Sequence, residues 1–262
     1  MSFYPKKSLG QNFLIDENTL NTIVDFSKIQ DQEVLEIGPG TGNLTEKILS
    51  KKPSKFYVVE KDHNLSSLLE KKFGNRINII NKDILDVDET ILSKNKLLVI
   101  GNLPYNISTE ILSKWILNLK NNFWFSNLIL MFQKEVADRI ISKFNDSNYG
   151  RLTVLVNWKL TVSKLIDVEP KCFYPVPKVQ STILNFLPKS NFYNINDPRN
   201  LELVTRIFFS ERRKMIKKPL NKLFKNPSDI CKKLKIDNNL RPQNLDPETY
   251  YNLTLELEKL RS

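Results

Sequence analysis

Short apolar runs rich in β-branched residues alternate with helical stretches through the first half of this 262-residue chain. The alternation predicts a mostly parallel sheet with helices on both faces, because parallel neighbours need a crossover connection and a helix usually supplies it. The expected strands are residues 33–37, 55–60, 77–81, 97–100 and 128–133. The expected helices are residues 17–26, 41–50, 64–73, 108–118 and 134–144, the first of them capped by Asp16.

The pattern changes from Arg151 onward. Residues 152–158, 164–168 and 182–186 are predicted to be further strands, added antiparallel at one edge of the sheet. Residues 190–198 are polar, and only helical patterns follow, at residues 201–217, 219–224, 228–233 and 247–260. We therefore expect one α/β domain, residues 1–189, and a small all-helical domain, residues 190–262.

Composition indicates the kind of partner this chain can bind, and it excludes a disulfide framework and a zinc cluster. The chain has 40 Lys and Arg against 29 Asp and Glu, a net charge of +11, which suits a polyanionic partner. An AT-rich genome also enriches Lys, Asn and Ile, so charge alone does not establish nucleic-acid binding. His63 is the single histidine, and Cys172 and Cys231 are too few for a disulfide framework or a zinc cluster. We expect a soluble, cytoplasmic protein with no metal, no secretion signal and no membrane span.

The first expected strand runs into a glycine-rich turn, Glu36–Gly42, which holds three of the seven glycines in the chain. Glycines at Gly38 and Gly40 let the backbone turn tightly and approach a ligand closely. The turn is similar to a dinucleotide fingerprint, but it is not a P-loop, because no Lys-Ser or Lys-Thr pair follows. By itself it does not separate NAD from S-adenosylmethionine, or either from a plain strand-to-helix turn.

Two carboxylates follow the next two expected strands. Glu60 is placed to accept hydrogen bonds from both ribose hydroxyls of a nucleoside, in either kind of cofactor site. Asp83 is placed to accept one from the amino group of a cofactor adenine, with Ile84 against the ring. Each acid alone is equally consistent with a surface residue or a helix cap. Together with the glycine turn, their spacing favours S-adenosylmethionine, because a dehydrogenase does not need Asp83.

The fourth expected strand ends at Asn102-Leu103-Pro104-Tyr105. An adenine amine is a poor nucleophile, because its lone pair is delocalised into the ring. The Asn102 side-chain oxygen and the Leu103 backbone carbonyl can accept hydrogen bonds from the N–H groups of this amine. These hydrogen bonds favour a pyramidal nitrogen with an exposed lone pair. Pro104 holds the turn without offering a competing donor, and Tyr105 can stack on a flipped base. A sulfonium methyl group is already activated, so this chemistry needs positioning more than a metal or a strong base. The alternative is an ordinary turn with a core tyrosine.

Beyond these motifs, the chain resembles the ribosomal RNA adenine dimethyltransferases that act on the small ribosomal subunit. The matching segments are Lys6–Leu14, Glu36–Gly42, Gly101–Ser108, Met131–Val136, Tyr149–Leu152, Phe173–Val179 and Arg212–Lys214. The resemblance implies a Rossmann-like S-adenosylmethionine-dependent methyltransferase fold, with a mostly parallel seven-stranded sheet. It also implies dimethylation of two adjacent adenosines near the 3′ end of 16S rRNA, in a small-subunit precursor, with a role in ribosome biogenesis.

The resemblance also implies roles for individual residues. It assigns the chemistry to Asn102, Leu103, Pro104, Tyr105 and Phe173, with Tyr105 and Phe173 holding the target base. The implied cofactor contacts are Gln11, Asn12, Leu14, Gly38, Gly40, Glu60, Lys61, Asp83, Ile84 and Asn102. The implied RNA contacts are Arg212, Arg213, Lys214, Lys217 and Lys218, for which a solvated helix face is the alternative.

The chain departs from the family pattern at two places. Gln180-Ser181-Thr182 stands where an acidic residue and an alanine are common, and Pro219 stands where a helix usually continues. Two alternative functions stay open: a resistance-type dimethyltransferase of 23S rRNA, and a non-catalytic assembly factor. An NAD-dependent dehydrogenase leaves Asp83 and Asn102 unexplained. We expect a monomer.

Overall fold

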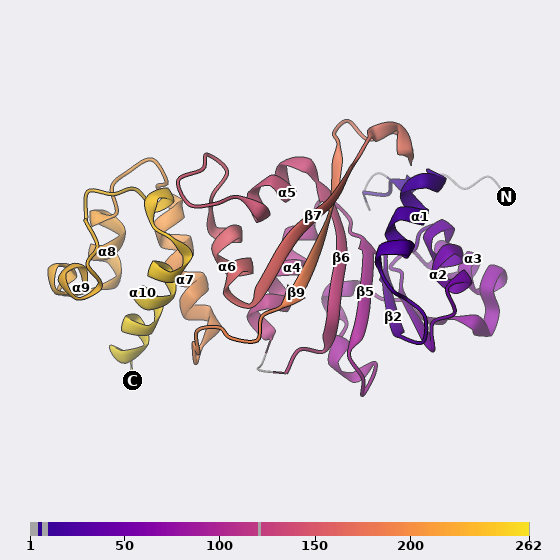
Figure 1. Ribbon diagram of the computed structural model, residues 1–262, viewed down its shortest axis with the longest axis horizontal. Helices are drawn as coiled ribbons and strands as arrows, with labels where there is room; N and C mark the ends of the chain where they lie inside the picture. Colours follow the sequence, from indigo (N-terminus) through magenta and orange to yellow (C-terminus); the bar gives the residue numbers. More distant parts are fainter. Residues whose placement is uncertain (1–4, 7–9, 120–121, 262) are drawn as a thin grey trace. The chain divides into compact units, whose positions relative to one another are not determined.

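The computed structural model describes residues 5–6, 10–119 and 122–261 (Figure 1). Lys7, Ser8 and Leu9 of the N-terminal motif lie outside the described residues. The alternation predicted for the first half is present. Its strands are β2 (Glu33–Ile37), β3 (Lys55–Val59), β4 (Asn78–Ile80), β5 (Leu97–Asn102) and β6 (Phe125–Gln133), and its helices are α1 (Glu17–Phe26), α2 (Asn43–Ser50), α3 (His63–Phe73), α4 (Ser108–Asn118) and α5 (Lys134–Ile141).

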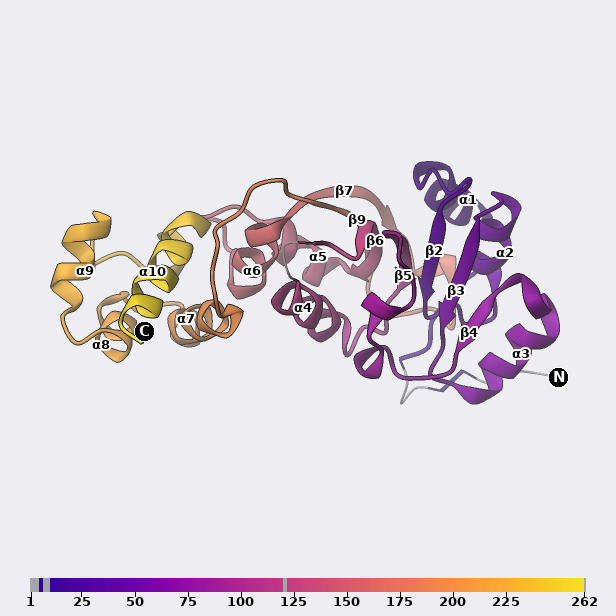
Figure 2. The same ribbon diagram turned by 90° about the horizontal axis from the view of Figure 1, so that it is seen from below.

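The sheet has seven strands in the order β4-β3-β2-β5-β6-β9-β7, where β7 is Leu160–Val168 and β9 is Ser181–Pro188. Strands β4 to β6 are parallel, and β9 is antiparallel to β6, from Leu128 opposite Phe186 to Gln133 opposite Ser181 (Figure 2). This confirms the predicted Rossmann-like fold with a mostly parallel sheet. The chain leaves β2 toward β4 and then returns to β5 on the other side of β2. Ligands bind at such a reversal, beyond the carboxyl ends of the strands.

Buried apolar side chains hold α1, α2 and α3 against the sheet. Leu20 of α1, Ile48 of α2 and Leu69 of α3 belong to one core cluster with Val34 of β2 and Ile100 of β5. All five residues of β2 are buried, Glu33 and Glu36 included, so the strand has no solvent-facing side. Asp16 caps α1 as predicted, because its side chain accepts a hydrogen bond from the Thr19 amide at 2.8 Å.

The strand predicted at residues 152–158 is wrong. Residues Arg151–Lys159 form helix α6, and β7 begins at the next residue. The apolar run carried no amphipathic stripe because α6 is buried nearly all round, and a short buried helix has the same composition as a buried strand. The Thr153 hydroxyl accepts the Gly150 amide at 3.2 Å and so occupies one of the free donors at the start of the helix.

The chain divides into two compact units. The first comprises residues 1–114, 119–137 and 163–188, and the second comprises residues 115–118, 138–162 and 189–262. The second unit contains α6 together with α7 (Pro198–Ser210), α8 (Lys217–Leu223), α9 (Pro227–Leu234) and α10 (Pro247–Lys259). The division into domains 1–189 and 190–262 stays a prediction. None of the helices in the described part of the chain is long and apolar enough to cross a membrane.

The helix predicted at residues 201–217 ends early, at Ser210, and residues 211–216 form a turn. Helix α8 then begins at Lys217, two residues before Pro219. Pro219 lies in the first turn of α8, where a missing backbone N–H removes no hydrogen bond within the helix. The proline therefore marks the start of a helix and does not interrupt one.

Candidate functional site

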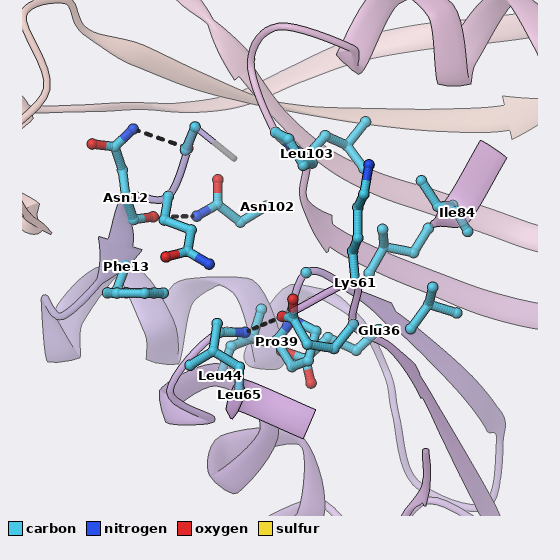
Figure 3. A pocket seen from close by; sticks show the side chains of 18 of the residues that line it. Asn12, Phe13, Glu36, Pro39, Leu44, Lys61, Leu65, Ile84, Asn102 and Leu103 are labelled. Atoms are coloured by element: carbon cyan, nitrogen blue, oxygen red, sulfur yellow. Dashed lines mark hydrogen bonds between the residues drawn. The ribbon is translucent and has the colours of Figure 1, made fainter. Parts of the chain in front are cut away.

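One pocket lies beyond the carboxyl ends of β2, β3 and β5 (Figure 3). Five stretches of the chain contribute lining residues: 10–14, 36–44, 59–65, 82–84 and 102–107. All ten residues predicted to contact the cofactor lie in this lining, as do Asn102, Leu103, Pro104 and Tyr105. The sheet brings them together because parallel strands end at the same edge.

The glycine turn packs directly against its neighbours in the pocket. Gly38 has a φ of +67°, and a Cβ atom there would lie 2.9 Å from the Asn102 carbonyl oxygen. Gly40 has a φ of +58°, and a Cβ atom there would lie 2.6 Å from the Phe13 ring. Both positions therefore require glycine, for the backbone conformation and for the space. The glycine turn therefore lines the pocket while it packs against the Asn102–Tyr105 turn and the N-terminal segment.

Two buried carboxyl groups lie beside the glycine turn. Glu60 accepts the Gly40 amide at 3.3 Å and the Asp62 amide at 2.8 Å, and burial raises its pKa above the ordinary value. Glu36 accepts the Thr45 hydroxyl at 2.7 Å. Burial, with a further contribution from Glu60, raises the pKa of Glu36 to about 8. Two carboxyl groups in one poorly solvated pocket favour a cationic ligand, which would relieve their desolvation and their repulsion.

This arrangement predicts that Glu36 makes the stability of the protein depend on pH. Below pH 4.5 the group is protonated in both the folded and the unfolded chain. Between pH 4.5 and about 8 the folded protein keeps a proton that the unfolded chain releases, so the free energy of unfolding falls as pH rises. Glu36→Gln should remove this slope, worth on the order of a few kcal/mol across the interval.

Urea unfolding of both proteins at pH 5, 6, 7 and 8 measures the effect. Glu36→Gln should gain stability relative to the unchanged protein as pH rises. Glu110→Gln, at an exposed position in the first turn of α4, is the matched control and should follow the unchanged protein. If Glu36→Gln kept the same slope as the control, the buried carboxyl would not be the source of the pH dependence.

Asp83 is engaged on both of its oxygens. Lys61 pairs with one at 2.6 Å, and the Leu85 amide donates to the other at 3.0 Å, which caps the short turn Ile84–Asp86. Although burial opposes the shift, these hydrogen bonds hold the pKa of Asp83 below its usual value. The carboxylate is therefore ionised at neutral pH, with lone pairs that can accept a further donor. Asp83 therefore caps the turn and also lines the pocket, so its predicted place in the cofactor site is compatible with the alternative of a helix cap.

The N-terminal segment is fastened over the pocket by side-chain contacts. Asp62, whose side chain is 1% exposed, accepts the Gln11 amide at 3.0 Å and pairs with Lys6 at 2.9 Å. Asn43 donates to the Leu14 carbonyl at 2.9 Å. Gln11 therefore anchors the N-terminal segment to Asp62 and also lines the pocket. The predicted N-terminal contacts reach the pocket because this segment is tied to residues that follow β2 and β3.

The turn Asn102–Tyr105 is oriented by the same N-terminal segment. The Asn102 side-chain nitrogen donates to the Asn12 carbonyl at 2.9 Å, which fixes the orientation of the amide. Its oxygen accepts no hydrogen bond from the described residues and remains available to a ligand. The Tyr105 hydroxyl lies 2.5 Å from the Ser181 hydroxyl, at the start of β9, and burial raises the pKa of Tyr105. Ser181 is therefore a supporting residue that the sequence showed only as a departure from the family pattern.

Comparison with known proteins identifies the chain. The family described as ribosomal RNA adenine dimethylase matches residues 3–259. The chain belongs to this family. The dimethylase is therefore an S-adenosylmethionine-dependent rRNA adenine methyltransferase, as predicted, and a dehydrogenase is excluded.

Individual relatives agree with this assignment. A ribosomal RNA small subunit methyltransferase A of Pelagibacter ubique is 62% identical over 256 residues, which cover 98% of each chain. One of the same name from Ehrlichia chaffeensis is 42% identical over 95% of each chain. A crystal structure of a dimethyladenosine transferase from Plasmodium falciparum superposes with a TM-score of 0.77 at 30% identity, over 94% of this chain and 98% of that one. The 23S rRNA methyltransferase ErmE, at a TM-score of 0.68 and 22% identity over 94% and 99% of the chains, shares the fold.

The pocket of the dimethylase fits S-adenosylmethionine. The cofactor carries a positive sulfonium, which suits the buried Glu36 and Glu60 carboxyls, and a ribose and an adenine, which suit Glu60 and Asp83. The glycine turn allows backbone approach. Apolar residues that the sequence did not single out complete the lining, among them Phe13, Leu44 and Leu65. Leu44 follows the glycine turn and Leu65 follows Glu60 by a few residues, so the sequence positions of both leucines could have predicted that they line the pocket.

Phe173, predicted to hold the target base, does not line the pocket. It is 1% exposed and forms β8 with Tyr174, paired to β1 (Phe13–Leu14) with Leu14 opposite Phe173. Both Leu14 and Phe173 belong to the core cluster with Ile183 of β9. A base could stack on Phe173 only after this packing opened. Its role as one wall of the base pocket stays a prediction.

The five basic residues predicted to contact RNA occupy different environments in the second unit. Arg212 is half-buried, and its guanidinium donates to the Asp146 and Ser147 carbonyls. Lys218 pairs with Glu211 at 2.5 Å. Arg213, Lys214 and Lys217 are exposed. Residues 212–214 lie in the turn before α8, so the cluster is not one face of a helix. Arg212 holds a loop, and the three exposed residues are free to meet phosphates.

Proposed function

We propose that this dimethylase transfers methyl groups from S-adenosylmethionine to two adjacent adenosines near the 3′ end of 16S rRNA. Its substrate would be a precursor of the small ribosomal subunit, and it would act as a cytoplasmic monomer with a role in ribosome biogenesis. The observation that carries the proposal is the Asn102 amide, oriented by Asn12 with its oxygen open to the pocket. The names of the relatives at 62% and 42% identity support the small subunit as substrate.

The proposed cofactor contacts follow from the chemistry of the pocket. Glu60 would accept hydrogen bonds from the ribose hydroxyls. Asp83 would accept a hydrogen bond from the adenine amino group, with Ile84 against the ring. Lys61, paired with Asp83, would keep that carboxylate ionised and in place. Gln11, Asn12 and Leu14 would close the pocket from the N-terminal segment, and Gly38 and Gly40 would let the backbone approach. When bound, the cofactor supplies an activated methyl group, so the protein needs no metal for this step.

The proposed catalytic contacts act on the target amine. The Asn102 oxygen and the Leu103 carbonyl would accept hydrogen bonds from its two N–H groups. These hydrogen bonds favour a pyramidal nitrogen with an exposed lone pair. Pro104 offers no competing donor. Tyr105, held by Ser181, would present its ring to the flipped base, and Phe173 would form the second wall after rearrangement. After the first transfer the same acceptors can bind the remaining N–H, which permits a second transfer.

One experiment tests the substrate and the reaction together. The protein is incubated with S-adenosylmethionine and either under-methylated small subunits or large-subunit precursors, and the rRNA is then mapped by mass. We expect two dimethylated, adjacent adenosines near the 3′ end of 16S rRNA. Methylation of 23S rRNA alone would favour the resistance type, and no methylation of either particle would favour an assembly factor without activity.

The three exposed basic residues and the half-buried Arg212 should differ in their effect on RNA binding. Replacing Arg213, Lys214 and Lys217 together by Gln should weaken binding to small subunits and reduce the slope of log affinity against log salt. The expected reduction is roughly one unit of slope for each lost phosphate contact. Arg212→Gln should instead loosen the loop at Asp146 and Ser147 and leave the salt slope nearly unchanged.

Binding of each variant to under-methylated small subunits at several salt concentrations measures the slope. Proteolysis within residues 142–150 reports the loop. A triple variant with the slope of the unchanged protein would remove these residues from the RNA interface. A strongly reduced slope in Arg212→Gln would show that Arg212 contacts phosphate as well.

A further inference from the structure

The ribbon of β1 and β8 has two faces that differ in environment. In an antiparallel pair, directly opposed residues point to the same side, and successive residues point to opposite sides. Leu14 and Phe173 are one opposed pair, and both are buried in the core cluster. Phe13 and Tyr174 are the other pair, on the opposite face. Phe13 lines the pocket and lies against Gly40, whereas Tyr174 is 58% exposed.

Tyr174 begins an exposed apolar segment beside the pocket. Val176 is 65% exposed and Val179 is 44% exposed, so three large apolar side chains within six residues face solvent. Exposed apolar side chains grouped within a few residues favour a binding surface, and we call residues 174–179 the apolar patch. Tyr174 is opposite Phe13, which lines the pocket, so the patch begins one strand away from the pocket lining.

The backbone on either side of this segment is held in place. The Cys172 carbonyl accepts the Ile15 amide at 2.9 Å, and the Gln180 carbonyl accepts the Lys134 amide at 2.9 Å. The Gln180 side chain also donates to Glu169. The exposed ring of Tyr174 and the methyl groups of Val176 and Val179 are therefore presented by an anchored loop, which lowers the ordering cost of binding a partner.

The charge beside the patch suits a polyanion. Lys178 is exposed and forms no ion pair within the described part of the chain, and Lys171 is exposed as well. The nearby acids are engaged: Asp16 by Thr19, Asp167 by Lys164 and Thr182, and Glu169 by Gln180. An exposed aromatic ring with unpaired positive charge beside it is the combination that binds single-stranded nucleic acid, by base stacking and by phosphate contact.

We propose that Tyr174 stacks on a nucleotide of the substrate RNA next to the flipped adenosine, with Lys178 at an adjoining phosphate. The inference rests on the proposed function and extends it to a residue that holds the flanking strand. Phe173 faces the core, so Tyr174 is the aromatic residue of β8 that RNA can reach without rearrangement. Tyr174 does not itself line the cofactor pocket, so it positions substrate and leaves cofactor binding intact.

The test compares Tyr174→Ala and Tyr174→Phe in steady-state methylation of under-methylated small subunits. Tyr174→Ala should raise KM about tenfold or more, because loss of one stacked base has an effect of this size. Its kcat, measured at saturating subunits, and its S-adenosylmethionine affinity, measured by calorimetry, should stay within twofold. Tyr174→Phe keeps the ring and should restore KM to within twofold. Phe26→Ala, a comparably exposed aromatic on α1, is the matched control and should not change KM.

Each other outcome has a distinct meaning. An unchanged KM in Tyr174→Ala, with normal turnover by the unchanged protein, would overturn the role of Tyr174 and leave the proposed function standing. No methylation by the unchanged protein would overturn both. If KM rose for whole subunits while affinity for a single-stranded RNA of the 3′-end sequence did not change, the patch would bind a protein of the particle. A KM in Tyr174→Phe as high as in Tyr174→Ala would assign the contact to the hydroxyl and refute stacking.

Discussion

Replacing Asn102 by alanine is expected to slow methyl transfer by a hundred- to a thousandfold or more, with the fold intact. The variant loses the acceptor aimed at the target amine, and loss of one aligned hydrogen-bonding group in an active site has an effect of this order. The fold should survive, because the side chain is half-buried and donates one hydrogen bond, to the Asn12 carbonyl, worth about 1 kcal/mol. Cofactor affinity should fall by less than about tenfold.

Single-turnover methylation of under-methylated small subunits measures the chemical step, and thermal unfolding measures the fold. Asn106→Ala, at a pocket-lining asparagine two residues beyond Pro104, is the matched control and should retain most of the rate. Asn102→Asp keeps an acceptor but removes the donor to the Asn12 carbonyl, so it should also lose rate, through misorientation. Full activity in Asn102→Ala would rule out the proposed mechanism.

Gly38→Ala is expected to cost at least a hundredfold in kcat/KM, because it strains the glycine turn and also pushes on the Asn102–Tyr105 turn. An alanine at a φ of +67° costs about 1–3 kcal/mol in backbone strain. In addition, its Cβ atom would lie 2.9 Å from the Asn102 carbonyl oxygen, a backbone atom that cannot move without shifting Leu103. Two shifted turns would misplace cofactor and target amine, and misplacement by about 1 Å can cost a hundredfold.

Gly74→Ala separates these two effects. Gly74 also has a positive φ, of +56°, but a Cβ atom there meets no heavy atom within 4 Å. Its alanine variant should lose about 1–3 kcal/mol of stability and keep its activity. Unfolding in urea and steady-state methylation of both variants give the comparison. Equal losses of activity would mean that strain alone matters and that contact with the Asn102 turn does not.

Much of the α/β fold could be predicted from the chain itself. Strands β2 to β6 were predicted correctly because each contains a short stretch rich in apolar residues between two helical patterns. The same rule failed for α6, because a helix buried nearly all round loses the amphipathic stripe that would distinguish it. It also extended α7 through residues 211–217, where a run of charged residues has no apolar period to mark the end of the helix.

Seven of the ten proposed cofactor residues could be placed together from the sequence, because each lies at or just after the end of a strand whose carboxyl end must meet the others. The resemblance to the family implied the other three, Gln11, Asn12 and Leu14. The burial of these side chains and the electrostatic effect of one on another could not be predicted in this way. The raised pKa of Glu36, the contact between Tyr105 and Ser181 and the anchoring of Arg212 all depend on partners far away along the chain.

The sequence alone determined the alternation of elements, the glycine and carboxylate positions and the Asn102 turn, since each is a local pattern of residue types and spacing. Tertiary structure decided which aromatic residue faces solvent beside the pocket. Phe173 and Tyr174 are neighbours, and only their pairing with Leu14 and Phe13, far earlier in the chain, sends one into the core and leaves the other exposed. A shift of that register by one residue would exchange the two faces, and nothing local in the sequence sets it.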